Sequence, residues 1–390
     1  MDDKIARIEL TEVAIPFKKE VRDLMGGSGG GLGMAIPAEE PWLGGDFVIC
    51  RLITKSGVVG CSEAFVWLPE TGVSPRQIVE AVQSDMAHYV LGESAFNTGR
   101  IAMRLDNNIT RNEVAKGMLD SALHELQARL INRPVVDLLG GAQVNKLPLT
   151  GLIPLLDDVE MMVGLALQWQ SNGCKTIRVK LGEGVVRDVE IMRAMRKALG
   201  PDVKLRVDYN QAYSAYEAIE AIEAITPFGL QIAEQPTKSN NYLAMAEVQK
   251  HVKVPIMAHE GCFSLSELHQ LHELGAIGAV GINAERPGGL TAAVKAIHFA
   301  EQQGYGVVLH NQPAGLGSVW QVHLGAAFHN SLSYDMELFG AVMLEHDLLK
   351  TPLNYSEGGV CLPEGPGWGV ELDLEAVEKY ATRPTTIIES

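Results

Sequence analysis

The chain has 390 residues, a formal net charge of −16 and 46% hydrophobic residues. This length predicts two domains and allows a sizeable core. The acidic balance argues against a nucleic-acid partner and against binding to anionic membrane surfaces.

The cysteines and the N-terminus predict a cytoplasmic protein. The five cysteines are scattered and odd in number, so we expect no disulfide framework. The N-terminus lacks the pattern of a signal peptide, and no apolar run approaches the roughly 20 residues of a membrane helix. We expect no membrane partner, and we expect the chain to form a homo-oligomer.

Residues 1–130 show strands followed by helices, a pattern typical of an α+β domain. The alternation of apolar and polar residues and the helical periodicity predict strands at 5–17, 47–54 and 58–65 and helices at 75–91 and 113–130.

A glycine-rich stretch at residues 26–33 interrupts this domain. Glycine loses much backbone entropy on ordering, so a plain linker is one interpretation. The other is a lid that orders over a substrate, because the flanks are apolar for a linker. These flanking residues are Met25, Met34, Ile36 and Trp42.

Residues 131–350 repeat the order strand, helix, strand. Strands are predicted near 148–153, 176–181, 204–209, 230–235, 255–260, 279–284, 306–311 and 333–338. Helices between them include 185–198, 241–250, 264–273 and 289–303. Eight such strands close a parallel barrel. Residues 351–390 form a turn-rich tail with a short strand at 370–374, and we expect this tail to return to the first domain.

Most of the predicted barrel strands end on a polar or ionisable residue. Asp208, Glu234 and Glu260 follow one another at intervals of 26 residues, and Lys180, Asn283 and His310 continue a similar spacing. Parallel barrels carry their chemistry at the C-terminal ends of the strands. The spacing therefore predicts one functional group from each successive strand around a single mouth.

The three carboxylates predict a metal site. Asp208, Glu234 and Glu260 would repel one another if they converged without a cation, and carboxylate oxygens suit Mg²⁺. Three unrelated salt bridges are the alternative. His259 could face the metal in place of Glu260, but we prefer Glu260 because Mg²⁺ favours oxygen ligands.

Lys180 and His310 are the predicted acid and base groups. We expect Lys180 to lie beside the predicted metal and to share a strand face with Arg178, an environment in which a lysine can act as a base near neutral pH. His310 ends the seventh strand, opposite the second strand across the mouth. Two such groups on opposite faces of a metal-bound substrate make a usable catalytic pair.

These residues resemble the enolase superfamily in its mandelate racemase/muconate lactonizing enzyme branch, and the resemblance covers nearly the whole chain. The matching segments are 120–123, 138–141, Arg178-Val179-Lys180, Asp208 with Asn210, Glu234-Gln235-Pro236, Glu260 and Arg286-Pro287-Gly288-Gly289. Together these motifs are specific, although each one alone is weak.

The resemblance implies a modified TIM barrel of the (β/α)7β type with an α+β capping domain. It also implies Mg²⁺, with Mn²⁺ as a substitute, bound to a small-molecule carboxylate substrate. The base would then abstract the α-proton and give a metal-stabilised enediolate.

Two departures from the family pattern bear on the reaction. Arg178 replaces the first lysine of the Lys-x-Lys strand end and cannot serve as a base. Asn283 stands where related enzymes carry Lys or Asp, and it can hydrogen-bond His310 but brings no charge. We therefore rank β-elimination of water first, with racemisation, epimerisation or cycloisomerisation as alternatives.

Substrate contacts are predicted for Arg178, Asn210, Asn283, Trp42 and the eighth-strand residue Glu337. Asp335 could take the place of Glu337, and a core or salt-bridge role for either is an equal alternative. The apolar flanks of the glycine-rich stretch favour a partly apolar carboxylate. A non-catalytic binding protein and a phosphate-binding barrel are further alternatives.

Overall fold

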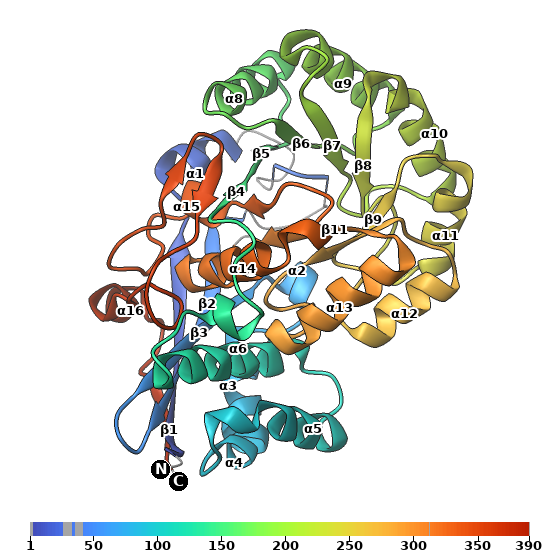
Figure 1. Cartoon of the computed structure of the whole chain (residues 1–390). Helices are drawn as coiled ribbons and strands as arrows, with labels where there is room; N and C mark the ends of the chain where they lie inside the picture. Colours follow the sequence, from blue (N-terminus) through green and yellow to red (C-terminus); the bar gives the residue numbers. More distant parts are fainter. Residues whose placement is uncertain (1–2, 26–32, 36–41, 312, 390) are drawn as a thin grey trace.

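Both ends of the chain contribute to one antiparallel sheet. In the computed structural model, which describes residues 3–25, 33–35, 42–311 and 313–389, its strand order is β15-β1-β2-β3. The bounds are β1 Ile5–Pro16, β2 Gly44–Thr54, β3 Val59–Val66 and β15 Thr386–Glu389. The first three strands form as predicted, and β15 near the end of the chain lies beside β1 near its start (Figure 1).

The first helix of this third lies between β1 and β2 and the others follow β3, so the α+β prediction is confirmed. They are α1 Lys19–Met25, α2 Leu68–Thr71, α3 Pro75–Ala81, α4 Ala87–Val90, α5 Thr98–Asn108, α6 Glu113–Leu130 and α7 Val135–Leu138. The predicted helix at 75–91 is α3 and α4 joined by a wider turn at Val82–Met86. Ser74 begins α3 with a capping box, in which its hydroxyl accepts from the amide of Gln77.

The second part of the chain forms a nearly closed barrel of eight parallel strands, in the order in which they occur in the chain. The strands are β5 Thr150–Ile153, β6 Thr176–Lys180, β7 Lys204–Asp208, β8 Leu230–Glu234, β9 Ile256–Ala258, β10 Ala279–Ile282, β11 Gly306–Asn311 and β12 Glu337–Leu338. The last is shorter than predicted. The amide of Thr150 donates to the carbonyl of Met336 at 2.8 Å and links the first strand to the last.

Seven helices connect the eight strands, as a (β/α)7β barrel requires. They are α8 Val159–Ser171, α9 Val185–Leu199, α10 Ala215–Ile225, α11 Tyr242–His251, α12 Leu265–Glu273, α13 Gly289–Gln303 and α14 Gly315–Ala327. Figure 1 shows α8 to α13 as an outer ring around the strands. The fold predicted from the spacing is therefore confirmed.

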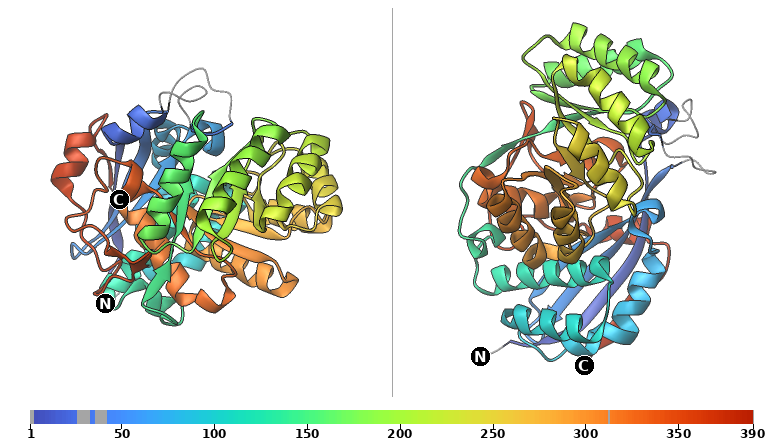
Figure 2. Two further views of the ribbon diagram at one scale, coloured as in Figure 1. Left: turned by 90° about the horizontal axis from the view of Figure 1, so that it is seen from above. Right: turned by 90° about the vertical axis from the view of Figure 1, so that its right-hand side faces the viewer.

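The capping sheet and its helices lie on one side of the barrel in Figure 1 and in the right-hand view of Figure 2. Helix α6 packs against β3 on one side and α13 on the other. Gly117 allows the approach to α13, since a Cβ there would lie 2.6 Å from the amide nitrogen of Gly289. Asp120 of α6 accepts hydrogen bonds from the amide and hydroxyl of Thr291, at 2.9 and 2.6 Å, in the first turn of α13. These contacts fix the cap on the barrel.

The tail after residue 350 runs back along the cap. Strands β13 Tyr355–Ser356 and β14 Gly359–Cys361 form a small sheet with β4 Lys146–Pro148, and β15 pairs with β1. The predicted strand at 370–374 is wrong: helix α16 Leu374–Tyr380 begins there, capped by Asp373. The boundaries at residues 130 and 350 stay predictions.

The structure also bears on a membrane-spanning helix and on a phosphate site. No helix within the described ranges is long and apolar enough to cross a membrane. The phosphate-binding alternative requires a glycine-rich turn after strand seven or eight, and Gly315 and Gly317 stand at the start of α14. There the carboxyl group of Glu63 accepts the amide of Leu316 at 3.1 Å. This side chain thus already accepts a backbone amide that a phosphate at the start of α14 would need.

Candidate active site

The ends of the barrel strands bring the predicted polar residues to one mouth. Lys180, Asp208 and Glu234 are the last residues of β6, β7 and β8. Four more polar residues are buried in the same way; three of them directly follow β9 or β10, and the fourth lies within β11. This further set comprises His259, Glu260, Asn283 and His310. The strands therefore position a shielded, highly polar cluster.

Lys180 is fixed by the neighbouring strand end. Its ammonium group donates to Asp208 Oδ2 at 2.5 Å and to Asn210 Oδ1 at 2.6 Å. Asn210 has a φ of 44°, a left-handed conformation that is uncommon for a residue other than glycine. This turn brings its side chain back over the strand end, so Asn210 orients the predicted base.

Arg178 lies one position deeper on the same strand face and binds carboxylates. Its guanidinium contacts Asp208, and Nε lies 2.9 Å from Glu234 Oε2. Nη1 lies 3.0 Å from Glu337 Oε2, and Arg206 also contacts Glu337. Glu337 therefore has the salt-bridge role that the sequence left open. The substrate contacts predicted for Arg178 and Glu337 stay predictions.

His259 lies between two of the predicted metal ligands. Its Nδ1 is 3.2 Å from Glu234 Oε1 and 3.4 Å from Glu260 Oε2. The side chain of Gln235 holds this segment, since its Oε1 accepts the amides of His259 and Gly261 at 3.1 Å each. Sequence reasoning missed this role of Gln235, because its side chain acts on the backbone that follows the next strand.

The carboxylates at the mouth fit a divalent cation. Burial raises the pKa of Glu260 to about 8, and burial also raises the pKa of Glu234 well above its usual range. Asp208 behaves differently: burial would raise its pKa, but Lys180 and Arg178 outweigh burial and lower it. Oε2 of Glu260 is buried with no hydrogen-bond partner among the described residues. A cation at these oxygens would relieve both the burial and the repulsion.

The ligand atoms that converge most closely come from one acid and two histidines. Single ligand atoms of Glu234, His259 and His310 all lie within 4.8 Å of one another. In the predicted set, Arg178 connects Asp208 to Glu234, and His259 connects Glu234 to Glu260. Asp208, Glu234 and Glu260 as the metal ligands therefore stay a prediction, and His259 lies beside two of them.

His310 faces acidic groups instead of Asn283. Its Nε2 lies 3.2 Å from Glu337 Oε2 and 3.5 Å from Glu234 Oε1. The expected hydrogen bond from Asn283 is absent within the described structure, where neither ring nitrogen of His310 has a hydrogen-bond partner. Asn283 Oδ1 instead accepts the amides of Glu285 and Arg286 and shapes the loop after β10. Burial lowers the pKa of His310 well below its usual value, so the ring is neutral.

Of the predicted lid at 26–33, positions 26–32 lie outside the described residues, and so does Ile36 in its flank. Of its flanks, Met25, Met34 and Trp42 are buried. Trp42 stacks on Trp67 with ring centres 4.7 Å apart. Its contact with substrate stays a prediction.

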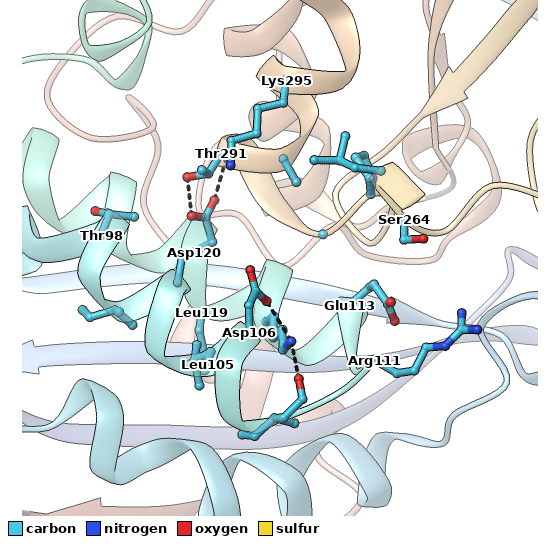
Figure 3. A pocket seen from close by; sticks show the side chains of 18 of the residues that line it. Thr98, Leu105, Asp106, Arg111, Glu113, Leu119, Asp120, Ser264, Thr291 and Lys295 are labelled. Carbon is cyan, nitrogen blue, oxygen red and sulfur yellow. Dashed lines mark hydrogen bonds and ion pairs between the residues drawn. The ribbon is translucent and has the colours of Figure 1, made fainter. Parts of the chain in front are cut away.

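A separate cavity of about 410 Å³ lies between the cap and helices α12 and α13. Figure 3 shows Asp120 bound to Thr291 on one wall, with Asp106 nearby. Asp106 pairs with Lys116 at 2.8 Å. The strand-end residues do not line this cavity, which distinguishes it from the cluster at the barrel mouth.

The chain matches two families of known proteins over most of its length. Residues 161–377 match the enolase C-terminal domain-like family, and residues 44–140 match the mandelate racemase/muconate lactonizing enzyme N-terminal domain. Among curated relatives, muconate cycloisomerase 1 of Acinetobacter baylyi is 29% identical over 85% of this chain and 91% of its own length. The L-Ala-D/L-Glu epimerase of Clostridium acetobutylicum is 31% identical over 83% of this chain and 90% of its own length.

The solved structures agree with these relatives. The muconate lactonizing enzyme of Pseudomonas fluorescens, complexed with muconolactone, superposes with a TM-score of 0.88 at 27% identity. The match covers 98% of this chain and 100% of that enzyme. The chain is thus an enzyme of the enolase superfamily and belongs to its mandelate racemase/muconate lactonizing enzyme branch.

Proposed function

We propose that this enzyme is an isomerase that moves the α-proton of a small carboxylate, with Lys180 as the base. The observation that carries the proposal is the position of Lys180, whose ammonium nitrogen lies 2.5 Å from Asp208 beside the acidic cluster. A base must lie within hydrogen-bond reach of its proton, and the end of β6 points into the mouth. The curated relatives reported above are isomerases, which favours isomerisation over the β-elimination of water ranked first from the sequence.

The acidic cluster would hold the metal ion of the reaction. Enzymes of this superfamily use Mg²⁺, and we assign the ion to Asp208, Glu234 and Glu260, with His259 adjacent and Mn²⁺ as a substitute. When bound, the ion would polarise the substrate carboxylate and so acidify the α-proton. The hydrogen bond to Asn210 would keep Lys180 directed at that proton. Arg178 lies deeper in the barrel and would balance the negative charge of the carboxylates that the ion does not neutralise.

One strong base fits cycloisomerisation better than epimerisation. An epimerase needs a proton-transfer group on each face of the substrate, and Asn283 at the sixth strand end cannot take or give a proton. Its side chain is also engaged with the backbone of its own loop. A cycloisomerase needs one group that removes or returns one proton, and Lys180 supplies that group. Epimerisation stays as a second candidate because His310 lies 3.5 Å from Glu234 and so reaches the mouth.

The test is proton nuclear magnetic resonance of candidate carboxylates in D₂O with Mg²⁺. We expect deuterium to enter at the α-carbon together with ring opening or closure. Inversion with deuterium incorporated would assign the enzyme as an epimerase with His310 as the second base. A keto product would restore the dehydratase. Absence of any α-exchange across a broad carboxylate library would contradict the proposal.

A further inference from the structure

His259 lies at the mouth between groups of opposite charge. Its Nδ1 faces two carboxylates, at 3.2 Å from Glu234 Oε1 and 3.4 Å from Glu260 Oε2. On the other side of the ring, Nε2 is in contact with Nη2 of Arg286. The proposed reaction assigns no task to His259 or to Arg286, although both are as deeply buried as Lys180.

Arg286 is held against this ring by contacts from the barrel and from the cap. Its loop is fixed by Asn283, whose side chain accepts the amide of Arg286 at 2.8 Å. The guanidinium packs on Phe263, with its carbon 4.9 Å from the ring centre. Nη2 also lies 3.4 Å from Glu70 Oε2 in the cap. The contact between Arg286 and His259 is therefore built into the site from several sides.

This contact decides which ring nitrogen of His259 carries the proton. Every nitrogen of a guanidinium is a donor, and the arginine side chain has no acceptor, so Nε2 must accept from Arg286. A ring with a proton on Nε2, whether neutral or as imidazolium, would set two donors against each other. The neutral ring of His259 therefore carries its proton on Nδ1.

The surroundings of Nδ1 favour the same tautomer independently. A bare lone pair on Nδ1 would repel the nearby oxygens of Glu234 and Glu260, whereas an N–H group at this position attracts both. Nδ1 and Glu260 Oε2 are buried, and neither has a hydrogen-bond partner of good geometry in the part of the chain that the structure describes. Each is thus available to the other across 3.4 Å.

A protonated ring nitrogen cannot bind a metal ion, because binding requires its lone pair. Nδ1 is the nitrogen of His259 that faces the proposed ligands Glu234 and Glu260, and Nε2 is engaged by Arg286. The ring is thereby withdrawn from the ion, and the ligands stay all oxygen. Oxygen ligands suit Mg²⁺ and Mn²⁺, whereas imidazole nitrogen favours Zn²⁺ and similar transition metals.

We propose that Arg286 determines the metal selectivity of this enzyme by holding the proton of His259 on Nδ1. His259 is then a positioning residue that directs its N–H group at the carboxylates of Glu234 and Glu260, and it is not a metal ligand. The assignment rests on the proposed function, in which the ion lies at Asp208, Glu234 and Glu260.

The wild-type enzyme provides the first test. With Mg²⁺ bound and histidine isotopically labelled at both ring nitrogens, nuclear magnetic resonance should show the proton of His259 on Nδ1 and none on Nε2. The variant His259→Gln identifies these signals by their loss. With Mn²⁺ bound, pulsed electron paramagnetic resonance should show no directly bound nitrogen from His259. A proton on Nε2, or a directly bound nitrogen that His259→Gln removes, would overturn the proposal.

Substitution of Arg286 tests its role in selectivity. Arg286→Met frees Nε2 of His259, so the proton can move there and Nδ1 can bind a metal ion. In calorimetry, the ratio of the Zn²⁺ affinity to the Mg²⁺ affinity should rise on the order of 10- to 100-fold. This ratio cancels the general gain in cation affinity that follows from removing a positive charge. Arg286→Lys keeps a cationic donor and should stay near the wild-type ratio.

Two further variants show where the effect arises. The double variant Arg286→Met/His259→Gln should return to the wild-type ratio, because the ring that gained metal binding is gone. Arg206→Met is the matched control, since Arg206 is also 2% exposed. Its side chain bonds Gln231 and Glu337 in place of His259, so its removal should leave the ratio unchanged. An unchanged ratio in Arg286→Met with native circular dichroism, or a raised ratio that survives in the double variant, would refute the role of Arg286.

Failure of this proposal can be told apart from failure of the proposed function. If Glu260→Ala weakens Mn²⁺ binding but a nitrogen of His259 is bound to the ion in the wild type, only the inference about His259 and Arg286 is wrong. If the affinity for Mn²⁺ is undiminished in the Ala variants of Asp208, Glu234 and Glu260, the ion lies elsewhere and the proposed function is wrong. The resonance of the His259 ring reports on its proton in either case.

Discussion

Arg178 is the residue whose removal tests the balance of charge in the barrel most directly. Its side chain is 1% exposed and contacts three carboxylates, those of Asp208, Glu234 and Glu337. Removing one partner of a buried ion pair costs about 3–5 kcal/mol, because the other charge stays buried. Arg178→Met keeps most of the volume and removes the charge. Without metal, we expect this variant to lose about 3–5 kcal/mol of unfolding free energy.

The same substitution should raise the affinity for Mg²⁺. A guanidinium bound to Asp208 and Glu234 repels a divalent cation at those oxygens, and two unit charges 4 Å apart interact by about 4 kcal/mol at an effective dielectric constant of 20. A tenfold to hundredfold rise in affinity needs only about 1.4–2.8 kcal/mol of that repulsion. Mg²⁺ at 100 times its Kd would then restore about 2.7 kcal/mol of stability.

Arg206→Met is the matched control. Arg206 is also buried, and its carboxylate partner is Glu337 at 3.3 Å. Its removal should destabilise the protein without raising the affinity for Mg²⁺. The assays are denaturant unfolding with Mg²⁺ or with a chelator, and calorimetric titration of the metal. If Mg²⁺ stabilises the two variants equally, or binds Arg178→Met more weakly than the wild type, the ion does not lie at Asp208 and Glu234.

Four other outcomes follow from the site and the cap. Lys180→Ala should stop α-proton exchange in D₂O, measured by nuclear magnetic resonance, while calorimetry shows that Mg²⁺ still binds. Replacing Asp208, Glu234 or Glu260 by Ala should abolish turnover and weaken Mg²⁺ binding, and undiminished affinity in all three variants would place the metal elsewhere. Because burial raises the pKa of Glu260 to about 8, Mg²⁺ should displace a proton from it at pH 7 and not above pH 9. Titration in buffers of different ionisation enthalpy measures this release, and a heat that does not depend on the buffer would contradict it. Burial also raises the pKa of Glu63 to about 8, so its contribution to stability is present below the usual carboxyl pKa and is lost as the pH rises through about 8. Between pH 5 and pH 8 the unfolding free energy of the wild type, measured with denaturant, should fall for this reason by on the order of 3–5 kcal/mol at most. Glu63→Gln should not show this fall, and equal falls in both proteins would exclude Glu63 as its source.

The barrel could be predicted because its strands repeat a simple physical pattern. Strands that are buried on both faces read as short apolar runs, and β10 shows four buried residues in succession. The prediction failed where a local cap outweighed strand propensity. At 370–374, Asp373 accepts the amides of Glu375 and Ala376, which starts a helix in place of a strand.

The contacts within the site depend on groups far apart in the chain, so the spacing could not predict them. The pattern located the end of β9 but not which of its neighbouring polar residues, His259 or Glu260, faces the metal. Gln235 holds the amides of His259 and Gly261, on either side of Glu260, and this contact between two strand ends leaves no mark in the spacing. The pairing of Arg286 with Glu70 joins positions 216 residues apart, and no periodicity marks such a contact.

The three acidic strand ends differ in the charges around them, and this difference orients the reaction. Asp208 contacts the cations Lys180 and Arg178 and stays ionised. Glu260 contacts neutral groups, the amide of Gln211 at 3.0 Å and the ring of His259, and its second oxygen has no hydrogen-bond partner among the described residues. A cation therefore gains most on the side of Glu260, where negative charge is least compensated. With Asp208 as one of the proposed ligands, the 2.5 Å contact between Lys180 and Asp208 would hold the base beside the ion, within reach of the α-carbon of a carboxylate bound there.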